Sequence, residues 1–153
     1  LNNHDIKVGG IDYSEGLIQT AKKAIPNGDF HLGEAVNVNP DVKFDFVISN
    51  SVFHYMTRGY AEKVLDLMLE KSMKGVAVLE VPDFECKAES EKMRQDALTP
   101  EEYRKKYEGL AHTYYDRNWF REFAKKRSLQ LTLSDVCVPN YIQSRFLFNC
   151  FIQ

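Results

Sequence analysis

The chain has 153 residues, of which 44% are hydrophobic and 12% are aromatic, and its formal net charge is −2. This composition is typical of one globular domain and excludes a disordered chain. The near-neutral charge gives no electrostatic reason to expect nucleic acid as a partner. No apolar run approaches the roughly 20 residues that cross a bilayer, so we expect no membrane contact.

The cysteines indicate a reducing compartment. Cys86, Cys137 and Cys150 are odd in number, far apart and without the spacing of metal ligands. They suit free thiols better than a disulfide framework. Residues 1–5 have none of the features of a signal peptide. We therefore expect a cytoplasmic protein with no metal centre.

The first half of the chain alternates between strand and helix patterns. Residues 7–11 predict a short strand, and Ser14 is a good N-cap for a helix that ends at residues 26–28 (Pro-Asn-Gly). Asp29–Leu32 predicts a second strand. Residues 44–48 form a compact apolar run, which predicts a buried, central strand of a parallel sheet.

The alternation continues with one more helix and one more strand. Thr57 can cap a helix that closes at Gly75, since glycine often follows a helix C-terminus. Residues 76–81 predict another buried strand, which Pro82 stops. This order predicts an α/β fold with a Rossmann-like, doubly wound and mostly parallel sheet.

After this fourth strand the character of the chain changes. Residues 83–115 are rich in charges of both signs, and residues 99–102 (Thr-Pro-Glu-Glu) form a capping box with proline at the first helical position. We expect a helical insert that could cover a pocket as a substrate lid. Asp116 then caps a last helix, and residues 129–138 and 145–152 predict an antiparallel strand pair. Residues 1–153 are thus expected to form one domain.

Polar residues follow three of the predicted strands. Asp12, Glu34 and the pair Ser49 and Asn50 each come where a strand ends. Loops at the carboxyl ends of parallel strands converge on one crevice. There Asp12 could accept hydrogen bonds from ribose hydroxyls and Glu34 from an adenine amino group, with Tyr13 flanking the base. The pattern favours a nucleoside-containing cofactor.

The order and spacing of these segments resemble those of class I S-adenosylmethionine-dependent methyltransferases of the small-molecule type. The resemblance is carried by residues 10–14 (Gly-Ile-Asp-Tyr-Ser), 33–35 (Gly-Glu-Ala) and 44–55 (Phe-Asp-Phe-Val-Ile-Ser-Asn-Ser-Val-Phe-His-Tyr). It extends to residues 75–80 and, more loosely, to the terminal strand pair.

The resemblance implies a cofactor, a reaction and roles for particular residues. It implies S-adenosylmethionine as the cofactor, with Asp12 at the ribose, Glu34 and Ala35 at the adenine, and Ser49 with Asn50 near the methionine part. The implied reaction is methyl transfer. The mixed charges and tyrosines of the insert favour a small polar metabolite or a sugar-like acceptor.

One part of the family pattern is missing from the printed sequence. In the family a strand and a Gly-x-Gly loop precede the acid-ending strand by roughly 20 residues, whereas only a handful of residues precede Asp12. We therefore expect the printed chain to be the C-terminal part of a longer protein, with the glycine-rich loop upstream of Leu1.

Three residues are candidates for contact with the substrate. His54 could take a proton from it, because a neutral imidazole with a reference pKa of about 6.5 is a suitable base at neutral pH. His112 and Tyr115 lie in a segment rich in polar aromatic residues, which could line a substrate pocket. The alternative is that these three side chains pack against the sheet.

Two other functions fit the same pattern. An acid after the second strand also serves the ribose of a nicotinamide cofactor, so an NAD-dependent oxidoreductase is one alternative. Residues 33–35 and the final antiparallel pair argue against it. The second alternative is a non-catalytic methyltransferase-like binding protein, because a fold alone does not establish a function.

Overall fold

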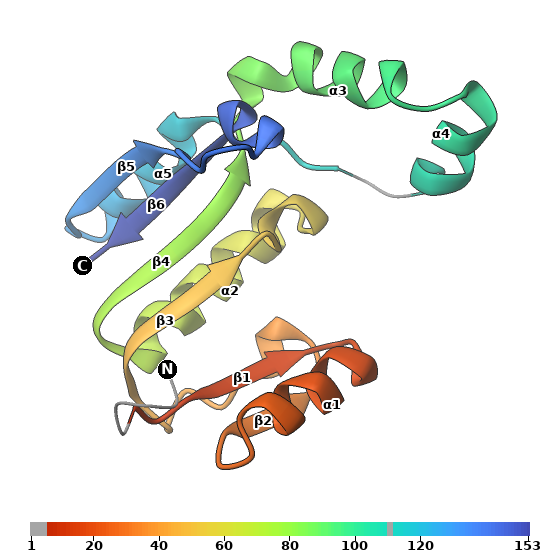
Figure 1. Ribbon diagram of the computed structural model, residues 1–153. Coiled ribbons are helices and arrows are strands. Elements are labelled where there is room, and N and C mark those ends of the chain that lie inside the picture. The colour runs from red at the N-terminus through yellow and green to blue at the C-terminus, as the bar shows by residue number, and fades with distance from the viewer. Residues whose placement is uncertain (1–5, 110–111) are drawn as a thin grey trace.

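A computed structural model describes residues 6–109 and 112–153. Strands and helices alternate as the sequence predicts, and Figure 1 shows their arrangement. The elements are β1 (Gly9–Asp12), α1 (Glu15–Ala24), β2 (Asp29–Leu32), β3 (Phe44–Asn50), α2 (Arg58–Lys71), β4 (Ser72–Pro82), α3 (Lys87–Asp96), α4 (Pro100–Tyr107), α5 (Arg117–Lys126), β5 (Leu131–Asp135) and β6 (Leu147–Ile152).

The strands form two sheets. β1 and β2 pair in parallel, and a four-stranded sheet has the order β3-β4-β6-β5. β3 and β4 are parallel, while β6 runs antiparallel to both β4 and β5. In Figure 1 the arrowheads of β1 and β3 point to the same side of the molecule. The structure confirms an α/β, Rossmann-like fold with a C-terminal antiparallel pair.

The helices begin where the sequence predicts. The side chains of Ser14, Thr57 and Asp116 accept hydrogen bonds from backbone N–H groups in the first turns of α1, α2 and α5. The capping box at the start of α4 is complete, because Thr99 and Glu102 each bond the backbone of the other. These short polar side chains satisfy N–H groups that have no partner within the helix.

The end of α2 differs from the prediction. The helix ends at Lys71, and Ser72 caps it by donating its N–H to the carbonyls of Met68 and Leu69. Gly75 therefore does not close the helix but lies inside β4. A Cβ at Gly75 would lie 3.1 Å from the Ile152 carbonyl oxygen, so this glycine allows the close approach of β6.

The prediction that residues 44–48 form a central, buried strand is also wrong for the described chain. β3 pairs only with β4 among the described residues, so it is an edge strand. The side chains of Phe46 and Ile48 are 58% and 62% exposed. Since side chains two residues apart share one face of a strand, this exposed face is apolar.

The core lies where α2 and α5 pack against β4 and β6. The largest fully buried side chains include Phe53, Leu65, Tyr115, Phe120 and Phe148. The helical insert leaves this core at Asp83, which is 3% exposed and accepts a 2.7 Å hydrogen bond from Nε of Arg117. Within the described residues no helix is long and apolar enough to cross a membrane.

Candidate functional site

The carboxyl end of β1 carries a carboxylate with a free oxygen. Asp12 is the last residue of β1 and is half-buried. Its Oδ1 accepts the Ser14 N–H at 2.8 Å, while its Oδ2 has no hydrogen-bond partner among the described residues. The Gly33 N–H donates to the Asp12 carbonyl at 2.9 Å, which joins the loop after β2 to this strand end.

Glu34 lies at the carboxyl end of the neighbouring strand β2. Its Oε2 accepts a hydrogen bond of 3.1 Å from the Tyr60 hydroxyl. Burial raises the pKa of Tyr60, and the Glu34 carboxylate raises it further, so the phenol stays protonated and donates. Ala35 begins a short 3₁₀ turn that packs against the core, whereas Tyr13 is 70% exposed beside Asp12.

The structure thus brings Asp12 and Glu34 to the same edge of one parallel pair. Asp12 is in register with Leu32, two residues before Glu34. Both carboxylates keep an oxygen that is free to accept a hydrogen bond from a ligand, and an exposed aromatic ring lies next to them. These groups fit the hydroxyls and the base of a nucleoside.

The carboxyl ends of β3 and β4 show backbone strain. Ser51, just after β3, and Glu80, within β4, have φ angles of 54° and 57°. Neither residue is glycine, and this left-handed conformation costs about 1–3 kcal/mol at each position. The Ser51 hydroxyl donates to Oε2 of Glu80, and the Glu80 N–H donates to Oδ1 of Asn149 at 3.1 Å. Strain of this kind clusters at functional sites.

The predicted residues Ser49 and Asn50 lie directly before this strained pair. They are the last two residues of β3, in register with Val78 and Leu79 of β4. Ser49 is half-buried and Asn50 is exposed. They therefore border the strand end where Ser51 meets Glu80.

A histidine pair lies in the loop after β3. His54 belongs to a short 3₁₀ turn (Phe53–Tyr55), and its ring centroid lies 4.7 Å from that of His112. The Thr113 N–H donates to the His54 carbonyl at 2.9 Å. On its other side His112 meets α3, because its Nε2 lies 2.8 Å from Nη2 of Arg94.

Both imidazoles are neutral at pH 7. Burial lowers the pKa of His54, the Arg94 guanidinium lowers it further, and the Glu80 carboxylate partly opposes them. Burial, Arg94 and His54 together lower the pKa of His112 to about 4. Since Arg94 can only donate, Nε2 of His112 is the acceptor in their hydrogen bond. His54 is left as a neutral base.

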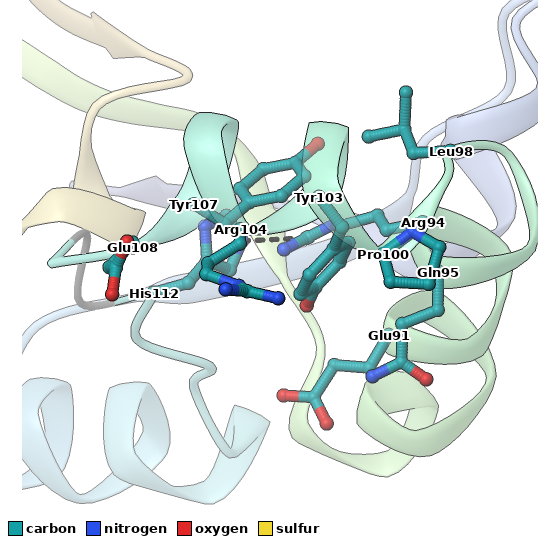
Figure 2. Close-up of a pocket in the computed structure, with 10 residues that line it drawn as sticks. All are labelled: Glu91, Arg94, Gln95, Leu98, Pro100, Tyr103, Arg104, Tyr107, Glu108 and His112. Carbon is teal, nitrogen blue, oxygen red and sulfur yellow. Dashed lines mark hydrogen bonds between the residues drawn. The ribbon is translucent and has the colours of Figure 1, made fainter.

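A pocket opens beside this pair, between α3 and α4. We call it the α3–α4 pocket; its volume is about 650 Å³, and its walls include Arg94, Tyr103, Tyr107 and His112. Figure 2 shows the Arg94 side chain extending across it toward His112. This volume lies in the range of small-molecule sites.

Tyr115 is the one predicted substrate residue that does not reach a surface. It is fully buried, and its hydroxyl donates to the carbonyls of Phe53 and Met56 at 3.1 and 3.0 Å. Burial raises its pKa. We therefore assign Tyr115 to the core, where it braces the turn that carries His54.

Sequence reasoning missed Ser51, Glu80 and Arg94. In the sequence, nothing distinguishes Glu80 from an ordinary strand residue, and Arg94 is one of many charged residues in the insert. Only the folded chain shows that two of these residues are strained and that the third meets a histidine. For Arg94, the one sequence signal that indicates its surroundings is the density of tyrosines in the insert.

The N-terminal part of the chain matches a known protein family. Residues 1–72, which include Asp12 and Glu34, match the family model described as "Methyltransferase domain". The match covers the first 72 of the 153 residues.

Solved structures with this fold are themselves methyltransferases or cofactor complexes. Magnesium protoporphyrin IX methyltransferase from Synechocystis PCC 6803, with bound SAH, is 15% identical with a TM-score of 0.64. The plantazolicin methyltransferase BpumL, in complex with a triazolic desmethylPZN analog and SAH, is 13% identical with a TM-score of 0.70. The DhpI-SAM-HEP complex is 12% identical with a TM-score of 0.66.

These matches cover nearly all of this chain but only part of the other proteins. They include 95%, 95% and 96% of this chain, and 62%, 66% and 68% of the respective matched chains. At 12–15% identity the likeness establishes the fold. The chain has the Rossmann-like fold of class I methyltransferases.

Proposed function

We propose that this protein binds S-adenosylmethionine and transfers its methyl group to a hydroxyl or amine of a small polar acceptor. The observation that carries the proposal is the pair of carboxylates at the ends of β1 and β2, within the segment that matches the methyltransferase family. Similar structures that hold SAM or SAH add support.

The residues at the β1–β2 edge would bind the nucleoside part of the cofactor. Oδ2 of Asp12 would accept from the ribose hydroxyls, and the free oxygen of Glu34 from the adenine amino group. Tyr13 and Ala35 would flank the base. Ser49 and Asn50, at the end of β3, would lie near the methionine part.

The chain itself would supply positioning and one proton acceptor. When bound, S-adenosylmethionine supplies a methyl group on a positively charged sulfur: the acceptor's lone pair forms the new bond, the carbon–sulfur bond breaks, and its electron pair stays on sulfur, which leaves a neutral thioether. His54 would take the proton that the acceptor hydroxyl or amine loses. Most of the acceleration would come from holding the nucleophile in line with the methyl group.

A titration of the full-length protein with S-adenosylmethionine and, separately, with NAD⁺ tests the proposal. We expect calorimetry to detect binding of S-adenosylmethionine and not of NAD⁺. Saturating S-adenosylmethionine, together with a set of small hydroxy and amino acids, should then release S-adenosylhomocysteine. Binding of NAD⁺ alone would favour the oxidoreductase alternative, and cofactor binding without any release would favour a non-catalytic binding protein.

A further inference from the structure

Arg94 differs from the other two half-buried arginines, Arg117 and Arg127, in having no carboxylate partner among the described residues. Arg117 bonds both Asp83 and Asp135, and Arg127 bonds both Glu62 and Asp66, at N–O distances of 2.6–3.2 Å. These four carboxylates neutralise the two guanidinium groups in structural ion pairs. No carboxylate of the described residues lies within the 4 Å ion-pair limit of Arg94.

The contacts of Arg94 are all with uncharged groups. Its Nη2 lies 2.8 Å from Nε2 of His112 and donates to the Ser90 hydroxyl at 3.4 Å. Its guanidinium carbon lies 5.8 Å from the ring centroids of both Tyr107 and Tyr114. These contacts fix the half-buried side chain in place but leave its positive charge unpaired.

Arg94 also keeps unused hydrogen-bond donors. A guanidinium has five N–H groups in a rigid fork that matches carboxylate and phosphoryl oxygens. The Nε and Nη1 atoms of Arg94 make no hydrogen bond to any described residue. An ordered, partly desolvated cation with free donors in a pocket is suited to an anion.

The walls of the α3–α4 pocket suggest what accompanies the anionic group. Apolar surface comes from Leu98, Pro100 and the rings of Tyr103 and Tyr107, whose centroids lie 4.9 Å apart at an interplanar angle of 46°. Glu91 also lines the pocket, but Lys87 lies 3.8 Å from its carboxylate.

Two further charged side chains complete the lining. Arg104 and Glu108 are exposed, and their charges are opposite. The half-buried charges of the pocket are therefore Arg94 and Glu91, and of these Glu91 is already paired with Lys87. These walls fit a small molecule with one acidic group on a planar or apolar body.

The pocket connects to the proposed reaction through the histidine pair. Arg94 bonds His112, and the His112 ring lies 4.7 Å from the His54 ring. A ligand anchored at Arg94 would therefore extend past His112 toward the base. We propose that Arg94 binds a carboxylate or phosphoryl group of the methyl acceptor in the α3–α4 pocket, so that the acceptor is a small organic acid or phosphate ester. This inference rests on the proposed function for the identity of the ligand as acceptor.

Direct binding of simple anions to the full-length protein tests the inference without any methyl transfer. The probes are benzoate, phenyl phosphate and the neutral benzyl alcohol, each titrated by calorimetry without cofactor. We expect at least one of the two anions to bind and benzyl alcohol to bind much more weakly. The preferred anion then distinguishes a carboxylic acid from a phosphate ester.

Variants assign the binding to Arg94. Arg94→Gln should weaken anion binding by about tenfold or more, because a charge-assisted interaction is lost. Arg94→Lys keeps the positive charge but loses the forked donor geometry. Its anion affinity should lie between those of the unchanged protein and Arg94→Gln. Arg121→Gln removes an exposed arginine on α5, outside this pocket, and should leave anion binding unchanged.

Three results would overturn the inference: no anion binding by the unchanged protein, equal binding of benzyl alcohol, or unchanged anion affinity in Arg94→Gln. Circular dichroism confirms that each variant is folded. The affinity for S-adenosylmethionine is measured on the same samples and should not change in Arg94→Gln. Loss of cofactor binding in the unchanged protein would instead refute the proposed function, so the two failures are distinguishable.

Discussion

The two edges of this fold hold their polar groups in different ways. At the β1–β2 edge, Asp12 and Glu34 lie at neighbouring strand ends, and each has one oxygen engaged by a nearby donor and one left free. At the β3–β4 edge, strained Ser51 and Glu80 lie beside His54, whose neighbours come from distant parts of the chain.

This difference in how the polar groups are held indicates which function suits each edge. Free carboxylates on a regular strand pair can bind a preformed ligand with little demand on the rest of the chain. A neutral base with a lowered pKa needs burial and charged neighbours, which several elements must supply together. We therefore propose that the first edge binds the nucleoside part of the cofactor and that the second edge carries the acceptor chemistry.

The largest effect that would separate the two edges is expected at His54. His54→Gln should lower kcat for methyl transfer by about 100-fold, because positioned proton acceptors contribute at least that much. Its affinity for S-adenosylmethionine should stay as in the unchanged protein. His31→Gln, an exposed histidine on β2, is the matched control. Equal kcat values for both variants would remove His54 from the reaction.

A smaller effect is expected at the tyrosine that braces the second edge. Tyr115→Phe removes a buried hydroxyl whose single proton is shared between the Phe53 and Met56 carbonyls, at the turn that carries His54. We expect the free energy of unfolding to fall by about 2 kcal/mol, as measured by urea denaturation. Tyr55→Phe, at a tyrosine that is 58% exposed, should change it by less than about 0.5 kcal/mol. Equal losses in the two variants would show that the buried hydroxyl does not stabilise the turn.

The smallest effect concerns pH. The folded pKa of His112 is lowered to about 4, whereas an unfolded histidine has a pKa of about 6.5. Between these values the unfolded chain binds the extra proton, so stability falls as the pH falls from 6.5 toward 4. Relative to His112→Gln, the unchanged protein should lose about 1 kcal/mol over this range, after allowance for solvent screening. Parallel stability curves for the two proteins would contradict the lowered pKa.

Much of the first edge could be predicted from the sequence. Strand ends, N-caps and the positions of Asp12 and Glu34 depend on local patterns, and the structure places both carboxylates at adjacent strand ends. The C-terminal end of α2 is harder to predict from the sequence. Gly75 does not end this helix but allows close approach of Ile152, a residue remote in sequence.

The second edge could be predicted only in part. His54 stands out as a polar residue after a strand, but its partners Glu80, Arg94 and His112 lie 26, 40 and 58 residues further along the chain. A left-handed φ at Glu80 depends on an irregular pairing of β4 with β6, for which no residue type in the sequence is a signal. Tyr115 was misplaced because its hydroxyl is satisfied by carbonyls inside the core.

The most direct test of the division between the two edges is the affinity for S-adenosylmethionine, measured by calorimetry in Asp12→Ala and His54→Gln. We predict that Asp12→Ala weakens binding at least about tenfold, the cost of losing a hydrogen bond to a charged group, while His54→Gln binds as the unchanged protein does. An unchanged affinity in Asp12→Ala would contradict the assignment of the β1–β2 edge to the cofactor.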